Sequence, residues 1–278
     1  MTLRQPVVAG RFYSADKKAL ETELESFLIK KEKIKNVFAI IAPHAGYTYS
    51  GKTAGAVYSC IDIPDVVFVL SPNHTGLGSP ISLDPAEGWS TPLGTIKTDL
   101  SILNKVKEKV PLAEFDPSAQ KMEHALEVQL PFIQTMNPNA KIVPITLSGF
   151  PFGVMQRLGI AISEIMLAEE AATGKRPLIV ASSDMTHFES VDSAKRKDMM
   201  AIDQIKKLDT QGFLKTVDEN DISLCGYYPI SVTIEAAVHY SNKKGKPMIV
   251  DLVDYTNSGM VTGDTNEVVA YAGIVLHD

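Results

Sequence analysis

The sequence is poor in cysteine and tryptophan, has no excess of basic residues and contains no long apolar run. Its two cysteines, Cys60 and Cys225, cannot form a disulfide framework, so nothing points to an oxidising compartment. No window approaches the roughly 18 continuous apolar residues of a membrane span, and the N-terminal residues lack the apolar stretch of a signal peptide. We therefore expect a cytoplasmic protein that does not enter a membrane.

The charge balance argues against nucleic acid as a partner. The 27 Lys and Arg residues are outnumbered by 33 Asp and Glu residues, which gives a formal net charge of −6. Proteins that bind nucleic acid generally carry a basic face. The one basic run, at 30–35, is interrupted by Glu32 and Ile34 and is typical of the solvated end of a helix. We expect no nucleic-acid partner.

Patterns typical of strands and of helices alternate along the whole chain. Helices are predicted by apolar residues at helical spacing, and strands by short runs of β-branched and apolar residues. The predicted helices span 15–33, 52–60, 99–109, 124–136, 154–171, 191–206, 211–218 and 229–241; the predicted strands span 37–43, 66–71, 141–147, 178–183, 248–254 and 268–276; and 75–94 is predicted to be a long irregular region or a hairpin. This order indicates an α/β fold with a mixed, largely parallel sheet covered by helices on both faces. Because no repeat or flexible linker divides the chain, we expect a single domain over residues 1–278.

Three of the six histidines lie where apolar runs end. His44, His74 and His187 follow the strands predicted at 37–43, 66–71 and 178–183. In open α/β sheets, ligands bind just beyond the carboxyl ends of the strands. His44 and His74 have no adjacent carboxylate, which favours metal ligands or a catalytic base, although either alone could be an ordinary loop residue. Two such loops at neighbouring strand ends favour one shared site.

Two further pairs of polar residues are candidates for the same site. Asp184 lies three residues before His187, so Asp184 could orient the His187 ring or bind metal, and His187 could act as an acid or base. Alternatively, Asp184 caps the helix that begins near Ser190. His124 and Glu127 share a face of the helix predicted at 124–136, so they could pair and support the pocket or be a purely structural pair.

Cys225 precedes a predicted helix, whereas Cys60 has the surroundings of a buried apolar residue. A cysteine beside a helix N-terminus is expected to have a lowered pKa and more thiolate, the form that binds metal or attacks an electrophile. Alternatively, Cys225 is a small buried side chain like Cys60. Two imidazoles and one thiolate would form a three-ligand set suited to Fe(II), Cu or Zn rather than to Mg or Ca.

Six segments, spread over most of the chain, match the motifs of one known family in its order. They are Gly10-Arg-Phe-Tyr13, Ala42-Pro-His-Ala-Gly-Tyr-Thr-Tyr-Ser-Gly51, Ser71-Pro-Asn-His74, Glu123-His124-Ala-Leu-Glu127, Ser182-Ser-Asp184-Met-Thr-His187 and Leu224-Cys225-Gly. In these segments the chain resembles the Memo family (mediator of cell motility), whose microbial members are called AmmeMemoRadiSam system protein B. The resemblance implies a fold like that of the class III extradiol dioxygenases, non-haem iron enzymes that open catechol rings.

By the same resemblance, His44, His74 and Cys225 fall on the metal-binding positions. Asp184 and His187 line the same pocket, and His187 resembles the acid/base histidine of the dioxygenases. Those enzymes have a glutamate where this chain has Cys225; a thiolate is softer, favours copper or a lower-potential iron, and can itself be oxidised. Family members bind copper or iron and affect cellular redox state, so the implied cofactor is Fe(II) or Cu. The microbial name implies a radical-SAM protein as a partner.

Three functions follow as hypotheses. The first is a metal-dependent redox protein, an oxidoreductase acting on an unknown small-molecule substrate, with His187 moving a proton. The second is a hydrolase with Cys225 as nucleophile and His187 as base, backed by Asp184. The third is a non-enzymatic module that binds a peptide or protein. The segments around His44, His74, His187 and Cys225 contain no arginine to bind a phosphopeptide, which makes the third the least favoured.

Overall fold

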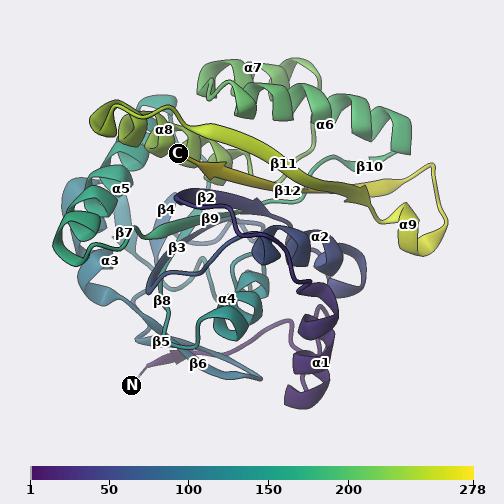
Figure 1. The fold of residues 1–278 in the computed structure, drawn as a ribbon, viewed down its shortest axis with the longest axis horizontal. Helices are drawn as coiled ribbons and strands as arrows, with labels where there is room; N and C mark the ends of the chain where they lie inside the picture. The colour runs from purple at the N-terminus through teal and green to yellow at the C-terminus, as the bar shows by residue number, and fades with distance from the viewer. Residues whose placement is uncertain (1) are drawn as a thin grey trace.

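The computed structural model describes residues 2–278, in which helices and strands alternate around one mixed sheet (Figure 1). Four parallel strands form its centre in the order β8 (Lys141–Leu147), β3 (Val66–Pro72), β9 (Leu178–Ser182) and β2 (Val37–Ala42). Beyond β2, β12 (Val268–His277) is antiparallel to β2, and β11 (Ile249–Asn257) is antiparallel to β12. The predicted α/β class and mixed, largely parallel sheet are confirmed.

The central strands are apolar on both faces because helices cover both. Along β3, Val67 and Val69 belong to one buried core, whereas Phe68 and Leu70 belong to the other. The first core contains residues of α1 (Lys17–Phe27), α2 (Tyr47–Ser59) and α4 (Leu130–Met136). The second contains residues of α3 (Leu100–Lys109), α5 (Phe152–Thr173), α6 (Val191–Lys206), α7 (Thr210–Glu219) and α8 (Tyr227–Lys244). Within the described residues, no helix combines the length and apolarity that crossing a membrane requires.

Most differences from the predicted elements lie in the first half of the chain. The helix predicted at 15–33 ends at Phe27, where Leu28 adopts an extended backbone. For residues 75–94, the hairpin alternative is confirmed, because β5 (Gly88–Thr91) pairs with β6 (Gly94–Thr98) as an antiparallel hairpin. The remaining elements, too short to show a period in sequence, are β1 (Leu3–Arg4), β4 (Ile81–Leu83), β7 (Ala113–Phe115), β10 (His187–Glu189), the 3₁₀ turn η1 (Glu127–Gln129) and α9 (Gly259–Thr262).

The order of the central strands brings three loops to one place. The connection from β2 to β3 runs through α2 on one face, and the connection from β8 to β9 runs through α5 on the other face. β9 lies between β3 and β2, so the carboxyl ends of all three strands are neighbours. A change of face between successive crossovers marks the usual ligand site of such sheets. His44, His74 and Asp184 follow these three strand ends.

A cluster of charged residues lies at the opposite end of the central strands, where their amino ends meet. Arg176 precedes β9, its Nη1 donates to Asp278 Oδ1 at 2.6 Å, and its guanidinium carbon lies 4.6 Å from the Tyr240 ring centroid. Burial would raise the pKa of the Asp278 carboxyl, but the hydrogen bond and charge of Arg176 outweigh it and hold that pKa below its usual value. Ionised Asp278 therefore stabilises the fold above the ordinary aspartate pKa, and this contribution is lost as the pH falls through the lowered one.

The Asp278→Asn variant is expected to lose about 1.5–3 kcal/mol of unfolding free energy at pH 7, the range for a hydrogen bond to a charged group. At a pH below the lowered pKa of Asp278, both proteins carry a neutral side chain at this position, so the difference should shrink toward zero. Urea unfolding of both proteins at the two pH values tests this. An equal loss at both pH values would assign the effect to packing rather than to charge.

Candidate metal centre

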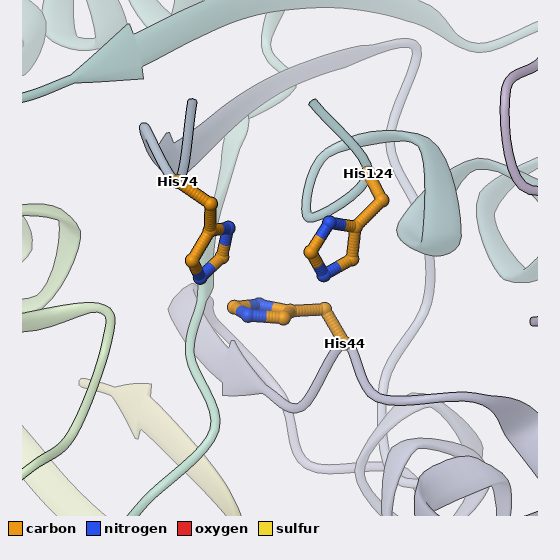
Figure 2. Close-up of side chains that lie close together, drawn as sticks. All are labelled: His44, His74 and His124. Atoms are coloured by element: carbon orange, nitrogen blue, oxygen red, sulfur yellow. The ribbon is translucent and has the colours of Figure 1, made fainter. Parts of the chain in front are cut away.

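Three histidine rings converge beyond the carboxyl ends of the central strands (Figure 2). His44 follows β2, His74 follows β3, and His124 lies in the loop before η1. One nitrogen from each ring belongs to a set whose members all lie within 4.8 Å of one another. The ring centroids are 5.2 Å apart for His44 and His74 and 4.8 Å apart for His74 and His124. Three imidazoles are a donor set suited to Fe, Cu or Zn, so these residues fit such a metal.

A chain of hydrogen bonds fixes which nitrogen of His44 carries the proton. The Ser182 hydroxyl donates to the Ala125 carbonyl at 2.7 Å and accepts from Gln129 Nε2 at 2.8 Å. His44 Nδ1 lies 2.9 Å from the same hydroxyl oxygen. Because the hydroxyl proton is already used, His44 Nδ1–H must be the donor in this contact. His44 Nε2 is then left with a lone pair, which is the form that binds a metal.

Glu123 fixes the tautomer of His74, as Ser182 fixes that of His44. Its carboxylate lies 2.9 Å from His74 Nδ1 and is fully buried. A carboxylate accepts, so His74 Nδ1–H donates and His74 Nε2 is left free, as in carboxylate–histidine–metal arrangements. Sequence reasoning singled out His124 and Glu127 of this motif but not Glu123. The available signal was its position directly before a candidate histidine.

His124 lies closer to the centre than its predicted supporting role implies. Its ring centroid is 5.5 Å from that of His44, and Phe12 packs against its other side at 4.8 Å. The predicted pairing of His124 with Glu127 is wrong. The i, i+3 argument assumed a helix from residue 124, but the helical turn begins only at Glu127. Glu127 instead holds the N-terminal segment, accepting from Arg4, from the backbone N–H groups of Val7 and Val8, and from the Tyr13 hydroxyl.

The three imidazoles differ in their affinity for protons. Burial lowers the pKa of His44 well below its usual value, and repulsion from the other histidines adds to this effect. Burial also lowers the pKa of His124. For His74, burial is outweighed by the hydrogen bond and charge of Glu123, which raise its pKa. His44 and His124 are therefore neutral at pH 7 and can offer a lone pair.

Cys225, the predicted thiolate, lies against this cluster. Its Sγ is 3.2 Å from His44 Nε2 and accepts from the Asp184 backbone N–H at 3.2 Å. The expectation of a lowered pKa is wrong for the protein without metal, because burial and the nearby Asp184 carboxylate raise the Cys225 pKa well above its usual value. The neutral thiol can donate to the His44 Nε2 lone pair. Cys60 is buried and donates to the Ala56 carbonyl at 3.2 Å, as its apolar surroundings suggested.

Asp184 and His187 do not form the predicted pair. Asp184 Oδ1 accepts from the backbone N–H groups of His44 and Ala45 at 2.7 and 3.2 Å, so it braces the loop that carries His44. Ser223 orients His187, with its carbonyl 3.0 Å from His187 Nδ1 and its hydroxyl 2.8 Å from the backbone N–H. His187 Nε2 keeps its lone pair at a half-buried position. The alternative prediction, that Asp184 caps the helix near Ser190, is also wrong, because Ser190 itself caps α6.

Comparisons with known proteins agree with this fold. A family model described as "Memo-like protein" matches residues 4–275. A "MEMO1 family protein" of Aquifex aeolicus is 41% identical over 278 residues and covers 99% of both chains. One from Methanosarcina acetivorans is 37% identical, covering 99% of this chain and all of that one. The crystal structure of an uncharacterized Escherichia coli K12 protein has the same fold at 13% identity, with a TM-score of 0.51 over 85% of this chain and 99% of that one.

Proposed function

Since this chain belongs to the Memo-like protein family, we propose that it is a metal-dependent oxidoreductase that holds Fe(II) or Cu at its histidine cluster and acts on a small-molecule substrate. The convergence of His44, His74 and His124, with their nitrogens within 4.8 Å, carries this proposal. The hydrogen bonds at His44 Nδ1 and His74 Nδ1 support it, because they place a ring proton on Nδ1 and so reserve Nε2 of each ring for a metal.

The proposed ligand set combines imidazole nitrogens with one soft thiolate. We propose His44 and His74 as ligands together with Cys225, whose Sγ already touches His44 Nε2, and His124 as a further donor. A soft thiolate favours copper and imidazoles suit iron, copper or zinc, so this set is promiscuous between them. Cys225 has to lose its proton to become a ligand, which makes its metal affinity fall at low pH.

Each polar residue around the cluster has a separate task. A bound Fe(II) or Cu would supply the one-electron redox chemistry that this chain's side chains lack. His187 is held by Ser223 through Nδ1, so its Nε2 can take a proton from a substrate or return one. Asp184 keeps the His44 loop in place through the hydrogen bonds that it accepts from two backbone N–H groups. A radical-SAM protein stays our proposed partner.

The test is a metal titration of protein purified without oxygen, with metal content measured by elemental analysis. Wild-type protein is expected to bind about one equivalent of Fe(II) or Cu(I). Protein that stays metal-free after such titration would rule out the proposed function.

A comparison of two variants assigns the ligands. Cys225→Ser should weaken Cu(I) binding more than Fe(II) binding, because a hydroxyl is a poor ligand for a soft ion. His124→Ala should weaken both ions to a similar degree. Competition with chelators of known affinity measures each effect. An unchanged Cu(I) affinity in Cys225→Ser would remove the thiol from the ligand set.

The hydrolase alternative receives little support from the same residues. A nucleophilic cysteine needs a lowered pKa, whereas burial raises that of Cys225. The proposed base, His187, makes its hydrogen bond to Ser223 rather than to Cys225. Rapid alkylation of Cys225 in folded, metal-free protein, undiminished by added metal, would be needed to revive this function.

A further inference from the structure

Glu123 is the most heavily engaged buried side chain beside the cluster. Its Oε2 accepts from the His74 backbone N–H at 2.5 Å, and its Oε1 lies 2.9 Å from His74 Nδ1. The same Oε1 accepts from the backbone N–H groups of His124 and Ala125, each at 2.9 Å. One carboxylate therefore joins the loop after β3 to the loop before η1. These loops are 49 residues apart along the chain at their closest bonded pair.

The same carboxylate also reaches the third histidine through two intermediate groups. Glu123 fixes the Ala125 N–H, and the Ala125 carbonyl in turn accepts from the Ser182 hydroxyl at 2.7 Å. That hydroxyl is the acceptor for His44 Nδ1. Segment 123–125 thus holds one ring directly, a second through its backbone and a third through Ser182. No other carboxylate in the described residues hydrogen-bonds to a ring nitrogen of these three histidines.

Glu127 shows that this arrangement is specific to Glu123. The two glutamates are four residues apart and both are fully buried. Glu127 bonds only to groups of the N-terminal segment: Arg4, Val7, Val8 and Tyr13. One glutamate of this motif therefore secures the N-terminus, and the other serves the cluster.

We propose that Glu123 is the positioning residue of the metal centre: it sets the spacing of the three imidazoles and locks His74 in the tautomer whose Nε2 faces the other rings. This inference rests on the proposed function insofar as the rings bind metal. Its structural content, the Nδ1–H tautomer of His74 and the tie between the two loops, can be measured in metal-free protein.

Glu123→Gln is the sharpest variant because it keeps the size of the side chain. A carboxamide has one acceptor oxygen and an NH₂ group, so it cannot serve the four N–H groups that Glu123 accepts from, and its NH₂ must face at least one of them. We expect Cu(I) and Zn(II) to bind about 10- to 100-fold more weakly, the range for losing the hydrogen-bond partner of a ligand histidine. Glu170→Gln is the matched control. That glutamate accepts from Tyr240 and pairs with Lys244, away from the cluster, so its loss should leave metal affinity unchanged.

Two readouts are used, chelator competition with Cu(I) and Zn(II) and long-range ¹H–¹⁵N NMR of the histidine rings in metal-free protein. At a pH above the raised His74 pKa, the wild-type spectrum should show Nδ1–H tautomers for His44 and His74, and the His74 signal should lose this character in Glu123→Gln. Wild-type protein that binds no metal but shows these tautomers would overturn the proposed function and leave the positioning role standing. Unchanged metal affinity and unchanged His74 tautomer in folded Glu123→Gln would overturn the inference. If the variant does not fold, the wild-type spectrum decides. An Nε2–H tautomer of His74 in that spectrum would overturn the inferred role of Glu123.

Discussion

His44→Ala is expected to abolish stoichiometric metal binding. His44 contacts all the other proposed ligands: its ring lies beside those of His74 and His124, and its Nε2 lies 3.2 Å from the Cys225 Sγ. Removing it takes away a ligand and the contact that holds Cys225. The affinity for Fe(II) or Cu should therefore fall by more than about 100-fold, beyond the effect of losing a hydrogen-bond partner of a ligand. Elemental analysis after anaerobic metal loading measures the loss.

Thermal unfolding gives a second readout of the same variant. A ligand present at 100 times its dissociation constant stabilises the folded state by about 2.7 kcal/mol, which corresponds to roughly 5 °C or more for a chain of this size. Wild-type protein should show this rise on metal addition and His44→Ala should not. His187→Ala is the matched control, because His187 is held by Ser223 and is not proposed as a ligand. Full metal content in folded His44→Ala would refute the site.

Glu127→Ala is expected to cost about 3–5 kcal/mol of unfolding free energy, the range for removing one partner of a buried ion pair. The Glu127 side chain is fully buried and that of Arg4 is 8% exposed, so the substitution leaves a nearly buried guanidinium without its carboxylate. The Tyr13 hydroxyl and the backbone N–H groups of Val7 and Val8 lose their acceptor as well. Urea unfolding of the metal-free protein measures the loss.

A double variant separates charge from hydrogen bonding. Arg4→Met with Glu127→Leu removes both charges and keeps apolar volume, so it should recover part of the stability that Glu127→Ala loses. The recovery should be incomplete, because Tyr13 and the two backbone N–H groups still lack an acceptor. A cost below about 1 kcal/mol for Glu127→Ala, the level typical of exposed pairs, would contradict a buried anchor for the N-terminal segment.

The fold was largely predictable because its signals are local. The strands at 37–42, 66–72, 141–147 and 178–182 are continuous apolar runs, and sheets buried on both faces require such runs. Apart from the hairpin that was one alternative for 75–94, the short strands of the first half were missed because two or three residues show too little of a period. The helix predicted at 124–136 is present as η1 followed by α4, but it begins only at Glu127, because apolar spacing locates a helix better than it locates the first residue.

For the site, the sequence by itself determined that His44 and His74 stand where strands end, and that Asp184, His187 and Cys225 follow in the same chain. The carboxyl ends of parallel strands share one edge, so this much needs no long-range information. Only the tertiary structure decided that β9 lies between β3 and β2, that His124 joins the cluster, and that Asp184 serves the His44 loop rather than His187. It also decided the roles of Ser182 and Glu123. Their hydrogen bonds to the rings join residues 138 and 49 positions apart, and such pairings depend on how loops pack, which no local period encodes.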